Sequence, residues 1–254
     1  MGQRLRPTIL RFDSLPSTNT EAARQAARGA PEGLCIIARE QTAGRGRQQR
    51  VWISPAGAGL YFSIILRPRL ELSAWPLITL AAALAVSDAL LDACGLPVDI
   101  KWPNDIQAEG RKLCGILAET VESETGSAVI LGIGINLTDR AFPEGLREIA
   151  TSVEAVTGSA PGVEALLGAL LRALDLRYAC LHETGGREMI LREWCAHSSY
   201  AEGRRVRVLL ATENFEGTTR GLERDGALRV ETDGGEIRVI RAGDVNALRP
   251  GVEE

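Results

Sequence analysis

The chain has 254 residues, of which 45% are hydrophobic and 24% are charged, so it is long enough to bury a core without disulfides or a structural metal. Its 29 Lys and Arg against 33 Asp and Glu give a formal net charge of −4. Proteins whose main task is to coat DNA or RNA are basic overall, so this charge argues against that class. The exception is local: Arg45, Arg47 and Arg50 stand within 41–50 with no acidic residue among them.

The ends of the chain and its thiols favour a cytoplasmic protein. The first seven residues carry charge but no apolar run follows them, so we expect no signal peptide. The best apolar stretch, Pro76–Val86, is shorter than the about 20 residues that a membrane-spanning helix needs, so we expect no membrane partner. The five cysteines form no C-x-x-C pair, which favours reduced thiols. His182 and His197 lack partners for a zinc site or a catalytic triad.

Hydrophobic spacing predicts a mixture of helices and strands over the first 200 residues. In chain order we expect a helix at 18–28, a strand at 34–38, a loop at 41–59, a strand at 60–66, a helix at 73–93, a strand at 98–101, two hairpin strands at 113–121 and 128–137, and helices at 163–181 and 188–196. Capping boxes begin at Thr18 and Thr151. The hairpin at 113–137 could form a sheet edge that pairs about a two-fold axis, so monomer and homodimer stay open.

After Tyr200 the helical spacing stops. Short alternating strands are predicted at 205–210, 217–222, 227–231 and 236–240, with Asp225-Gly226 as one of the turns between them. We therefore predict an α+β protein: a mixed sheet with flanking helices over residues 1–200 and a small β-barrel over residues 201–254.

The first candidate site is the segment from Gln41 to Trp52. Glycines at alternate positions permit close backbone approach, and arginines between them present guanidinium groups to phosphate or carboxylate oxygens. Trp52 could stack on a flat ring. A solvated basic loop or an RNA-binding fragment of RGG type is an equal alternative. The segment lacks the third glycine of a dinucleotide fingerprint, because Gln49 stands there, and it has no Gly-Lys-Ser/Thr of a P-loop.

Three further segments carry polar groups at strand ends. Lys101–Asp105 follows a short strand and offers an anion-binding amine and an oxygen ligand for Mg²⁺, or it is a plain turn. Arg111–Leu117 opens with two cations that stabilise ligand charge or protect a strand edge. Gly132–Leu137 has strand glycines that mark the approach of a ligand or of another backbone, and it contains Asn136, which donates and accepts hydrogen bonds.

Taken together and in this order, the motifs closely resemble biotin protein ligases, the biotin–[acetyl-CoA-carboxylase] ligase family. The resemblance runs from about Phe12 into the C-terminal β-module. The matching segments are Ser17–Asn19, Gln41–Arg47, Trp52 with Ser54 and Pro55, Leu60–Ser63, Lys101–Asp105, Arg111–Leu117 and Gly132–Asn136. The resemblance implies a catalytic domain like that of class II aminoacyl-tRNA synthetases, followed by an SH3-like β-barrel.

The resemblance also implies a reaction. ATP and biotin give biotinyl-5′-AMP and pyrophosphate, with Mg²⁺, and the biotinyl group then passes to a lysine of a biotin carboxyl carrier protein domain. No nucleic-acid partner is implied. A Gly- and Arg-rich loop at 44–59 would act as a lid that protects the adenylate from water.

The site residues carried over from the family form three sets. The catalytic set is Arg45, Arg47, Lys112 and Asp105, with Asp105 also facing Mg²⁺ or the acceptor amine. The biotin-binding set is Ser17, Thr18, Asn19, Gln41, Gly44, Arg45, Gly46, Arg47, Lys112, Gly115 and Gly132. The ATP-binding set is Arg47, Trp52, Lys101, Asn104, Lys112 and Asn136.

The sequence departs from the family at two positions, and other functions stay open. Gln49 stands where glycine is common in the family, so the torsion of the loop at this position is in doubt. Cys114 stands where alanine is common, and we expect a small buried residue there and no nucleophile. Sixteen residues precede Ser17, fewer than a DNA-reading domain needs, so the chain resembles the monofunctional form. The alternatives are a lipoate-type ligase or acyltransferase, a biotin-sensing regulator without catalysis and, less favoured, an RNA-binding protein.

Overall fold

The structure is a computed structural model that describes residues 5–123 and 126–248. The first strands are β1 (Thr8–Leu15), β2 (Leu34–Gln41), β3 (Gly59–Leu66), β4 (Asp99–Lys101), β5 (Asp105–Ala108), β6 (Arg111–Val121) and β7 (Ala128–Asn136). The helices are α1 (Thr18–Ala27), η1 (Arg47–Gln49), η2 (Leu72–Ala74), α2 (Pro76–Cys94), α3 (Leu146–Ile149), α4 (Val153–Thr157), α5 (Val163–Leu181) and α6 (Gly186–Ala196). The last strands are β8 (Glu202–Leu209), β9 (Asn214–Leu222), β10 (Leu228–Thr232), β11 (Ile237–Ile240) and β12 (Asp244–Ala247).

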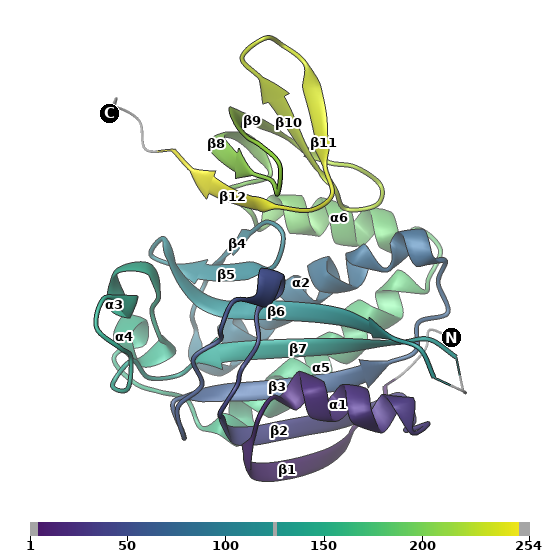
Figure 1. Cartoon of the computed structure of the whole chain (residues 1–254), viewed down its shortest axis with the longest axis vertical. Coiled ribbons are helices and arrows are strands. Elements are labelled where there is room, and N and C mark those ends of the chain that lie inside the picture. The colour runs from purple at the N-terminus through teal and green to yellow at the C-terminus, as the bar shows by residue number, and fades with distance from the viewer. Residues whose placement is uncertain (1–4, 124–125, 249–254) are drawn as a thin grey trace.

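A seven-stranded mixed sheet forms the larger part of the molecule, in the order β1-β2-β3-β7-β6-β5-β4 (Figure 1). β1 and β2 are parallel, and the other neighbours in this sheet are antiparallel. The predicted hairpin is confirmed as β6 and β7, with Cys114 opposite Ile135 and Val121 opposite Ala128. β3 pairs with β7, whereas β5 pairs with β6 only over Arg111–Gly115, so β7 is the only described strand beside the second half of β6. Pairing of two copies through this hairpin stays a prediction; in the strand order of the described sheet, the outer strands are β1 and β4.

The two faces of the sheet carry different layers. Along β3, Leu60, Phe62 and Ile64 belong to the main core with α2 and α5, whereas Ile65 packs with residues of α1. This division follows from the alternation of side chains along a strand. Tyr61 and Ser63 therefore face the α1 side, which is the side on which the candidate site lies.

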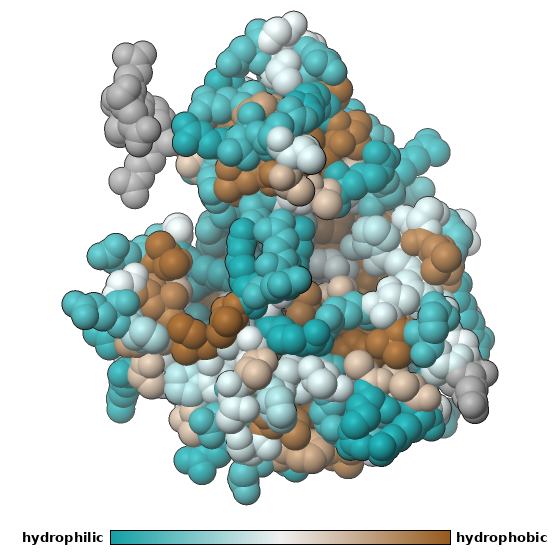
Figure 2. All heavy atoms as spheres, viewed as in Figure 1, coloured by the Kyte–Doolittle hydropathy of each residue, from teal (hydrophilic) through white to brown (hydrophobic). Residues whose placement is uncertain are grey.

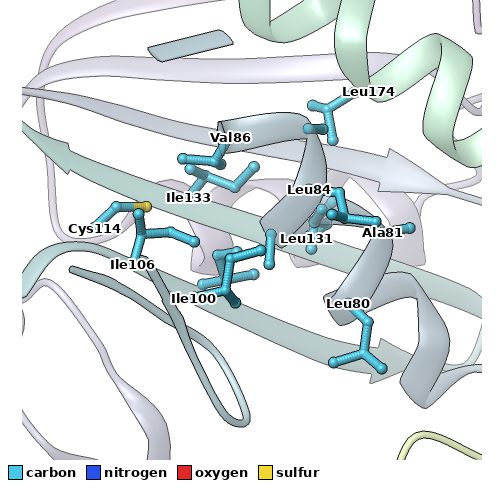
Figure 3. Close-up of a cluster of buried hydrophobic side chains, with 14 of the residues drawn as sticks. Leu80, Ala81, Leu84, Val86, Ile100, Ile106, Cys114, Leu131, Ile133 and Leu174 are labelled. Atoms are coloured by element: carbon cyan, nitrogen blue, oxygen red, sulfur yellow. The ribbon is translucent and has the colours of Figure 1, made fainter. Parts of the chain in front are cut away.

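The main core is built around α2. Its side chains meet those of four strands and of α5; the labelled residues are Leu80, Ala81, Leu84 and Val86 of α2, Ile100, Ile106, Cys114, Leu131, Ile133 and Leu174 (Figure 3). The apolar stretch is longer than the sequence analysis predicted: residues Leu72–Cys94 are long and apolar enough to cross a membrane by length and composition. Most of that window is buried inside the protein, so its hydrophobicity forms the core.

Both predicted capping boxes are wrong by one residue. The N-cap of α1 is Ser17, which makes no side-chain capping bond. The Thr18 hydroxyl instead lies within hydrogen-bond distance of Gln41 and Ser63. The N-cap of α4 is Ser152, whose hydroxyl accepts a hydrogen bond from the backbone N–H of Ala155 at 3.1 Å. The Thr18 side chain, which the sequence predicted to cap α1, therefore contacts residues of the candidate site and does not cap the helix.

The second sheet is antiparallel and five-stranded, in the order β11-β10-β9-β8-β12, and it lies above the β4 end of the large sheet (Figure 1). The four strands predicted after Tyr200 are confirmed, and β12 is added by its pairing with β8. The indole N–H of Trp102 donates to the carbonyl of Gly226 at 3.1 Å, which joins this sheet to the turn between β4 and β5. The strands β1 and β5 were not predicted.

Candidate active site

A cleft of about 370 Å³ opens on the α1 face of the large sheet. Figure 2 shows a strongly hydrophilic segment across the centre of this side and hydrophobic residues beside α3. Of the site residues predicted from sequence, all except Gly44 line the cleft: Ser17, Thr18, Asn19, Gln41, Arg45, Gly46, Arg47, Trp52, Lys101, Asn104, Asp105, Lys112, Gly115, Gly132 and Asn136. A Cβ at Gly44 would lie 2.3 Å from the carbonyl of Trp52, so this glycine allows the loop to fold back on itself.

Strand glycines form the floor of the cleft, and large side chains lie directly on them. Gly115 of β6 is opposite Gly134 of β7. A Cβ at Gly134 would lie 2.5 Å from Nε1 of Trp52, and one at Gly132 would lie 2.0 Å from Oδ1 of Asn19. These glycines therefore make room for neighbouring side chains as well as lining the cleft. The Trp52 ring lies against Gly134 and Gly115, and its Nε1 is buried without a hydrogen-bond partner in the described structure.

One end of the cleft is a network of neutral polar groups. The backbone N–H of Thr18 donates to Oε1 of Gln41 at 2.8 Å, and the Thr18 hydroxyl lies 3.1 Å from the same oxygen. Nε2 of Gln41 donates to the Ser54 hydroxyl at 2.8 Å. Ser63, which is fully buried, lies 2.8 Å from Oγ1 of Thr18 and 2.6 Å from Oδ1 of Asn19. These groups offer both donors and acceptors to a small polar ligand.

Cations and carboxylates gather at the centre. Lys112 Nζ lies 2.7 Å from Oδ1 of Asp105 and 5.4 Å from the centre of the Trp52 ring. Arg47 donates to Oδ1 of Asn104 at 3.1 Å and lies 3.6 Å from Asp244. Burial lowers the pKa of Arg47, while Asp244 and Asp105 act in the opposite direction. An arginine stays protonated in spite of such burial, so fixed positive charge faces the cleft.

Lys101 adds a second amine. Its Nζ donates to Oδ1 of Asn246 in β12 at 3.1 Å. Burial lowers its pKa, and Asp105 and Asp244 offset part of this effect. Lys101 and Lys112 are the only two lysines among the 29 Lys and Arg residues of the sequence, and both line this cleft.

The loop between β2 and β3 folds back as an irregular hairpin over the cleft. Isolated bridges join Gln41 to Ser54 and Arg45 to Val51. At its tip Gln48 and Gln49 adopt positive φ values of 54° and 60°, a region that glycine reaches without strain. The loop torsion that the sequence left in doubt is therefore left-handed at Gln49.

Asp244 is a site residue that the sequence analysis missed. It belongs to β12, pairs with Arg50 and with Arg47, and lines the cleft. The carbonyl of Gly243 accepts a further hydrogen bond from Arg47 at 3.2 Å. No local signal could have found Asp244, because it lies 194 residues from Arg50 and reaches the cleft only through the packing of the two sheets.

The opposite end of the cleft has an apolar wall. Phe142, Leu146 and Ile149 line it, and the sequence analysis did not single them out. Nδ2 of Asn136 donates to the carbonyl of Thr151 at 3.0 Å, and the backbone N–H of Thr151 donates to the carbonyl of Lys112 at 2.9 Å. Asn136 thus holds the end of this wall against the strands that carry the cations.

Asp105 does not form a metal cage by itself. Its carboxylate is engaged by Lys112, and within residues 5–123 and 126–248 no group of three or more His, Cys, Asp or Glu side chains could hold a metal ion. Mg²⁺ binds most often through several oxygen ligands and waters. The protein groups present therefore do not fit a resident magnesium site.

Comparison with known proteins identifies the family. The model of the biotin/lipoate A/B protein ligase family matches residues 11–136, and the model of the biotin protein ligase C-terminal domain matches residues 203–246. The chain is 39% identical to the bifunctional ligase/repressor BirA of Bacillus subtilis over 252 residues, which is 96% of this chain and 74% of that protein. The chain belongs to the biotin protein ligase family.

Two further relatives agree with this assignment. The biotin–[acetyl-CoA-carboxylase] ligase of Mycobacterium tuberculosis is 36% identical over 92% of this chain and 86% of its own length. The biotin protein ligase of Aquifex aeolicus, solved in complex with biotin and ATP, superposes with a TM-score of 0.82 at 28% identity and covers 95% of this chain and 99% of its own. The predicted fold, a mixed sheet with flanking helices and an SH3-like C-terminal β-module, is confirmed for this biotin protein ligase.

Proposed function

We propose that this biotin protein ligase joins biotin to ATP and then transfers the biotinyl group to a lysine of a biotin carboxyl carrier protein domain. In the first step a biotin carboxylate oxygen attacks the α-phosphorus of ATP, the bond to the β-phosphate oxygen breaks, and pyrophosphate leaves. In the second step the lysine amine attacks the carbonyl carbon of biotinyl-5′-AMP, AMP leaves, an amide forms and the amine loses a proton. The overall reaction is AMP-forming.

The observation that carries this proposal is the concentration of positive charge in one cleft of an acidic protein. Arg45, Arg47, Lys101 and Lys112 all line the cleft, while the chain as a whole has a net charge of −4. The first step brings a carboxylate and a triphosphate together, and both are anions. Fixed cations that face the reacting groups stabilise the charge that develops during such a transfer. We assign Arg47 and Lys112 to the reacting carboxylate and α-phosphate.

The neutral polar end of the cleft suits the ureido ring of biotin. Thr18, Gln41 and Asn19 supply donors and acceptors close together, with Ser63 behind them. Ser17 and Gly132 line the same end, and Gly115 and Trp52 lie between it and the cations. We therefore place the bicyclic ring of biotin beside Thr18 and Gln41, with the valerate chain directed along Trp52 toward Lys112.

The nucleotide is assigned to the other end. Lys101, Asn104 and Asn136 line it together with the apolar wall. An adenine ring can pack on apolar side chains while backbone groups read its edge. We expect magnesium to be carried by the triphosphate, because the described carboxylates do not form a cage for it.

The proposal divides the chain into a catalytic unit, residues 1–200, and a C-terminal unit, residues 201–254; residues 1–4, 124–125 and 249–254 lie outside the described structure. Asp244 supports a contribution of the C-terminal unit to the active site, because it belongs to β12 and lines the cleft of the catalytic unit. We place the enzyme in the cytoplasm. Its five cysteines are free, which suits a reducing compartment.

The deciding experiment uses labelled biotin, ATP, Mg²⁺ and a purified carrier domain. We expect label on the carrier lysine, and none when that lysine of the carrier is replaced by arginine. Label from lipoate in place of biotin would move the chain to the lipoate-type ligases. Biotin binding without adenylate formation or transfer would favour a non-catalytic regulator and overturn the proposal.

A further inference from the structure

The carboxylate of Glu119 connects helix α1 to the loop between β2 and β3, at the end of the cleft that we assign to biotin. Oε2 of Glu119, in β6, accepts a hydrogen bond from Nδ2 of Asn19 in α1 at 2.8 Å. The same oxygen accepts one from Nη2 of Arg45 in the loop at 2.7 Å. Glu119 is not among the residues that line the cleft, whereas both of these partners, Asn19 and Arg45, line it.

The register of β6 against β7 places Glu119 within reach of Asn19. Leu117 is opposite Gly132 of β7, and Glu119 follows two residues later on the same face. Asn19 occupies the space that a side chain at position 132 would fill, as its Oδ1 would lie 2.0 Å from a Cβ there. The buried amide of Asn19 can therefore reach Glu119 because residue 132 is glycine.

Glu119 is the nearer of two acceptors that fix the direction of the Asn19 amide. Nδ2 of Asn19 also lies 3.3 Å from the carbonyl of Leu117, and because a carboxylate and a carbonyl only accept hydrogen bonds, the amide nitrogen faces both of them. Oδ1 of Asn19 then faces Ser63, whose Oγ is 2.6 Å away. Ser63 Oγ is in turn 2.8 Å from Oγ1 of Thr18, which lines the cleft. The orientation set at Glu119 thus reaches Thr18.

We propose that Glu119 is a positioning residue for biotin: it holds Arg45 and the Asn19–Ser63–Thr18 chain in the arrangement that receives the ligand. This inference rests on the proposed function. The Arg45–Glu119 pair is partly exposed, with 45% and 32% of the two side chains accessible. An ion pair with this exposure contributes little to folding, whereas the hydrogen bond to the buried Asn19 adds to stability, so unfolding has to be measured beside biotin binding.

The test compares biotin with ATP in the Glu119→Ala enzyme. We expect the dissociation constant and KM for biotin to rise about tenfold, since hydrogen bonds to a charged group are lost. The KM for ATP should stay within about twofold, because the nucleotide end does not touch this network. Glu119→Gln should fall between the two enzymes, since its amide oxygen still accepts one hydrogen bond.

Two further variants make the test specific. Glu164→Ala removes a similar exposed pair, with Arg11 at 2.8 Å, outside the cleft, and should leave both constants unchanged. In an Arg45→Ala background, Glu119→Ala should weaken biotin binding less than in the wild-type enzyme, because one of its two partners is already gone.

Three results would overturn the inference: an unchanged biotin constant in Glu119→Ala, an equal rise for biotin and ATP, or full additivity with Arg45→Ala. Thermal unfolding of each variant shows whether a change reflects the fold. Failure of the proposed function would look different, since the wild-type enzyme itself would then transfer no biotin to the carrier domain.

Discussion

Lys112 Nζ and Asp105 Oδ1 lie 2.7 Å apart between β5 and β6, inside the cleft. Side chains in such partly exposed pairs contribute about 0–1 kcal/mol to folding. Loss of a fixed cation beside a transferring phosphate lowers rates by on the order of 10²- to 10³-fold. We therefore expect Lys112→Ala to fold almost normally and to form adenylate slowly, as measured by biotin-dependent exchange of labelled pyrophosphate into ATP.

Arg111→Ala is the matched control for this prediction. Arg111 precedes Lys112 in β6, pairs with Glu109 at 3.0 Å and does not line the cleft. Its loss should leave exchange unchanged. The role assigned to Lys112 is refuted if Lys112→Ala exchanges pyrophosphate normally or if its melting temperature collapses.

Asp244 predicts how the loop over the cleft is held. Asp244→Asn removes the charge that faces Arg47 and Arg50, so the loop should detach more often and trypsin should cut after Arg50 faster. Asp225→Asn, which affects the pair with Arg241 in the same β-module, should not change that rate. Mass spectrometry of the fragments measures both.

Bound ligands should slow tryptic cleavage of the loop over the cleft, whereas Asp244→Asn should accelerate it. If residues 44–59 act as a lid that closes over the adenylate, biotin with ATP should slow tryptic cleavage within this segment of the wild-type enzyme. Equal cleavage rates with and without the two ligands would exclude a lid at this loop.

Gln49 allows a direct test of backbone strain. The left-handed conformation costs a residue with a Cβ about 1–2 kcal/mol. A glycine avoids this strain but loses more backbone entropy on folding, which costs about 0.5–1 kcal/mol. With φ at 60°, Gln49→Gly should raise the free energy of unfolding by up to about 1 kcal/mol. Gln49→Ala keeps the Cβ and should give no such gain in urea unfolding; equal stability of the two variants would contradict the strain.

Lys101 predicts a pH effect. Burial places its pKa below the ordinary 10.5, while Asp105 favours the charged form. The unfolded chain then holds this proton more tightly, so the contribution of Lys101 to the free energy of unfolding increases as the pH rises from the lowered pKa toward 10.5. Side-chain NMR of lysine should show a low midpoint, which Asp105→Asn should lower further. A midpoint of 10.5 or above would refute the effect of burial.

The sequence predicted long, strongly patterned elements well. The alternating run at 60–66 and the helix at 163–181 are present as β3 and α5. The short strands β5 and β12, with four residues each, were missed because pairing with neighbours stabilises them more than their own pattern does. β1 was missed because it is an edge strand whose residues are mostly exposed, so it lacks a clear apolar face.

The site was predictable where residues act in contiguous motifs. Two such motifs, at 41–47 and 101–105, reach the cleft from nearby strand ends through Gln41, Arg45, Gly46, Arg47, Lys101, Asn104 and Asp105. Glu119 and Asp244 were not predictable, because their partners lie 74 to 194 residues away and depend on the register of β6 and on the docking of the β-module. Asn19 and Asn104 were found, but their hydrogen bonds to Glu119 and Arg47 belong to the folded state alone.

Because both lysines lie in the cleft, the rest of the protein is protected from modification by an acyl-adenylate that leaves the site. An escaped acyl-adenylate modifies lysine amines, whereas guanidinium groups stay protonated and do not compete. Outside the cleft all basic side chains other than histidine are arginines, so no lysine amine is present there to be acylated. Arg50 lines the cleft and 62% of its side chain is exposed, so with biotin and ATP but no carrier, the Arg50→Lys enzyme should acquire biotin at residue 50, as measured by mass spectrometry. An unmodified residue 50 would show that the adenylate does not react at this exposed position.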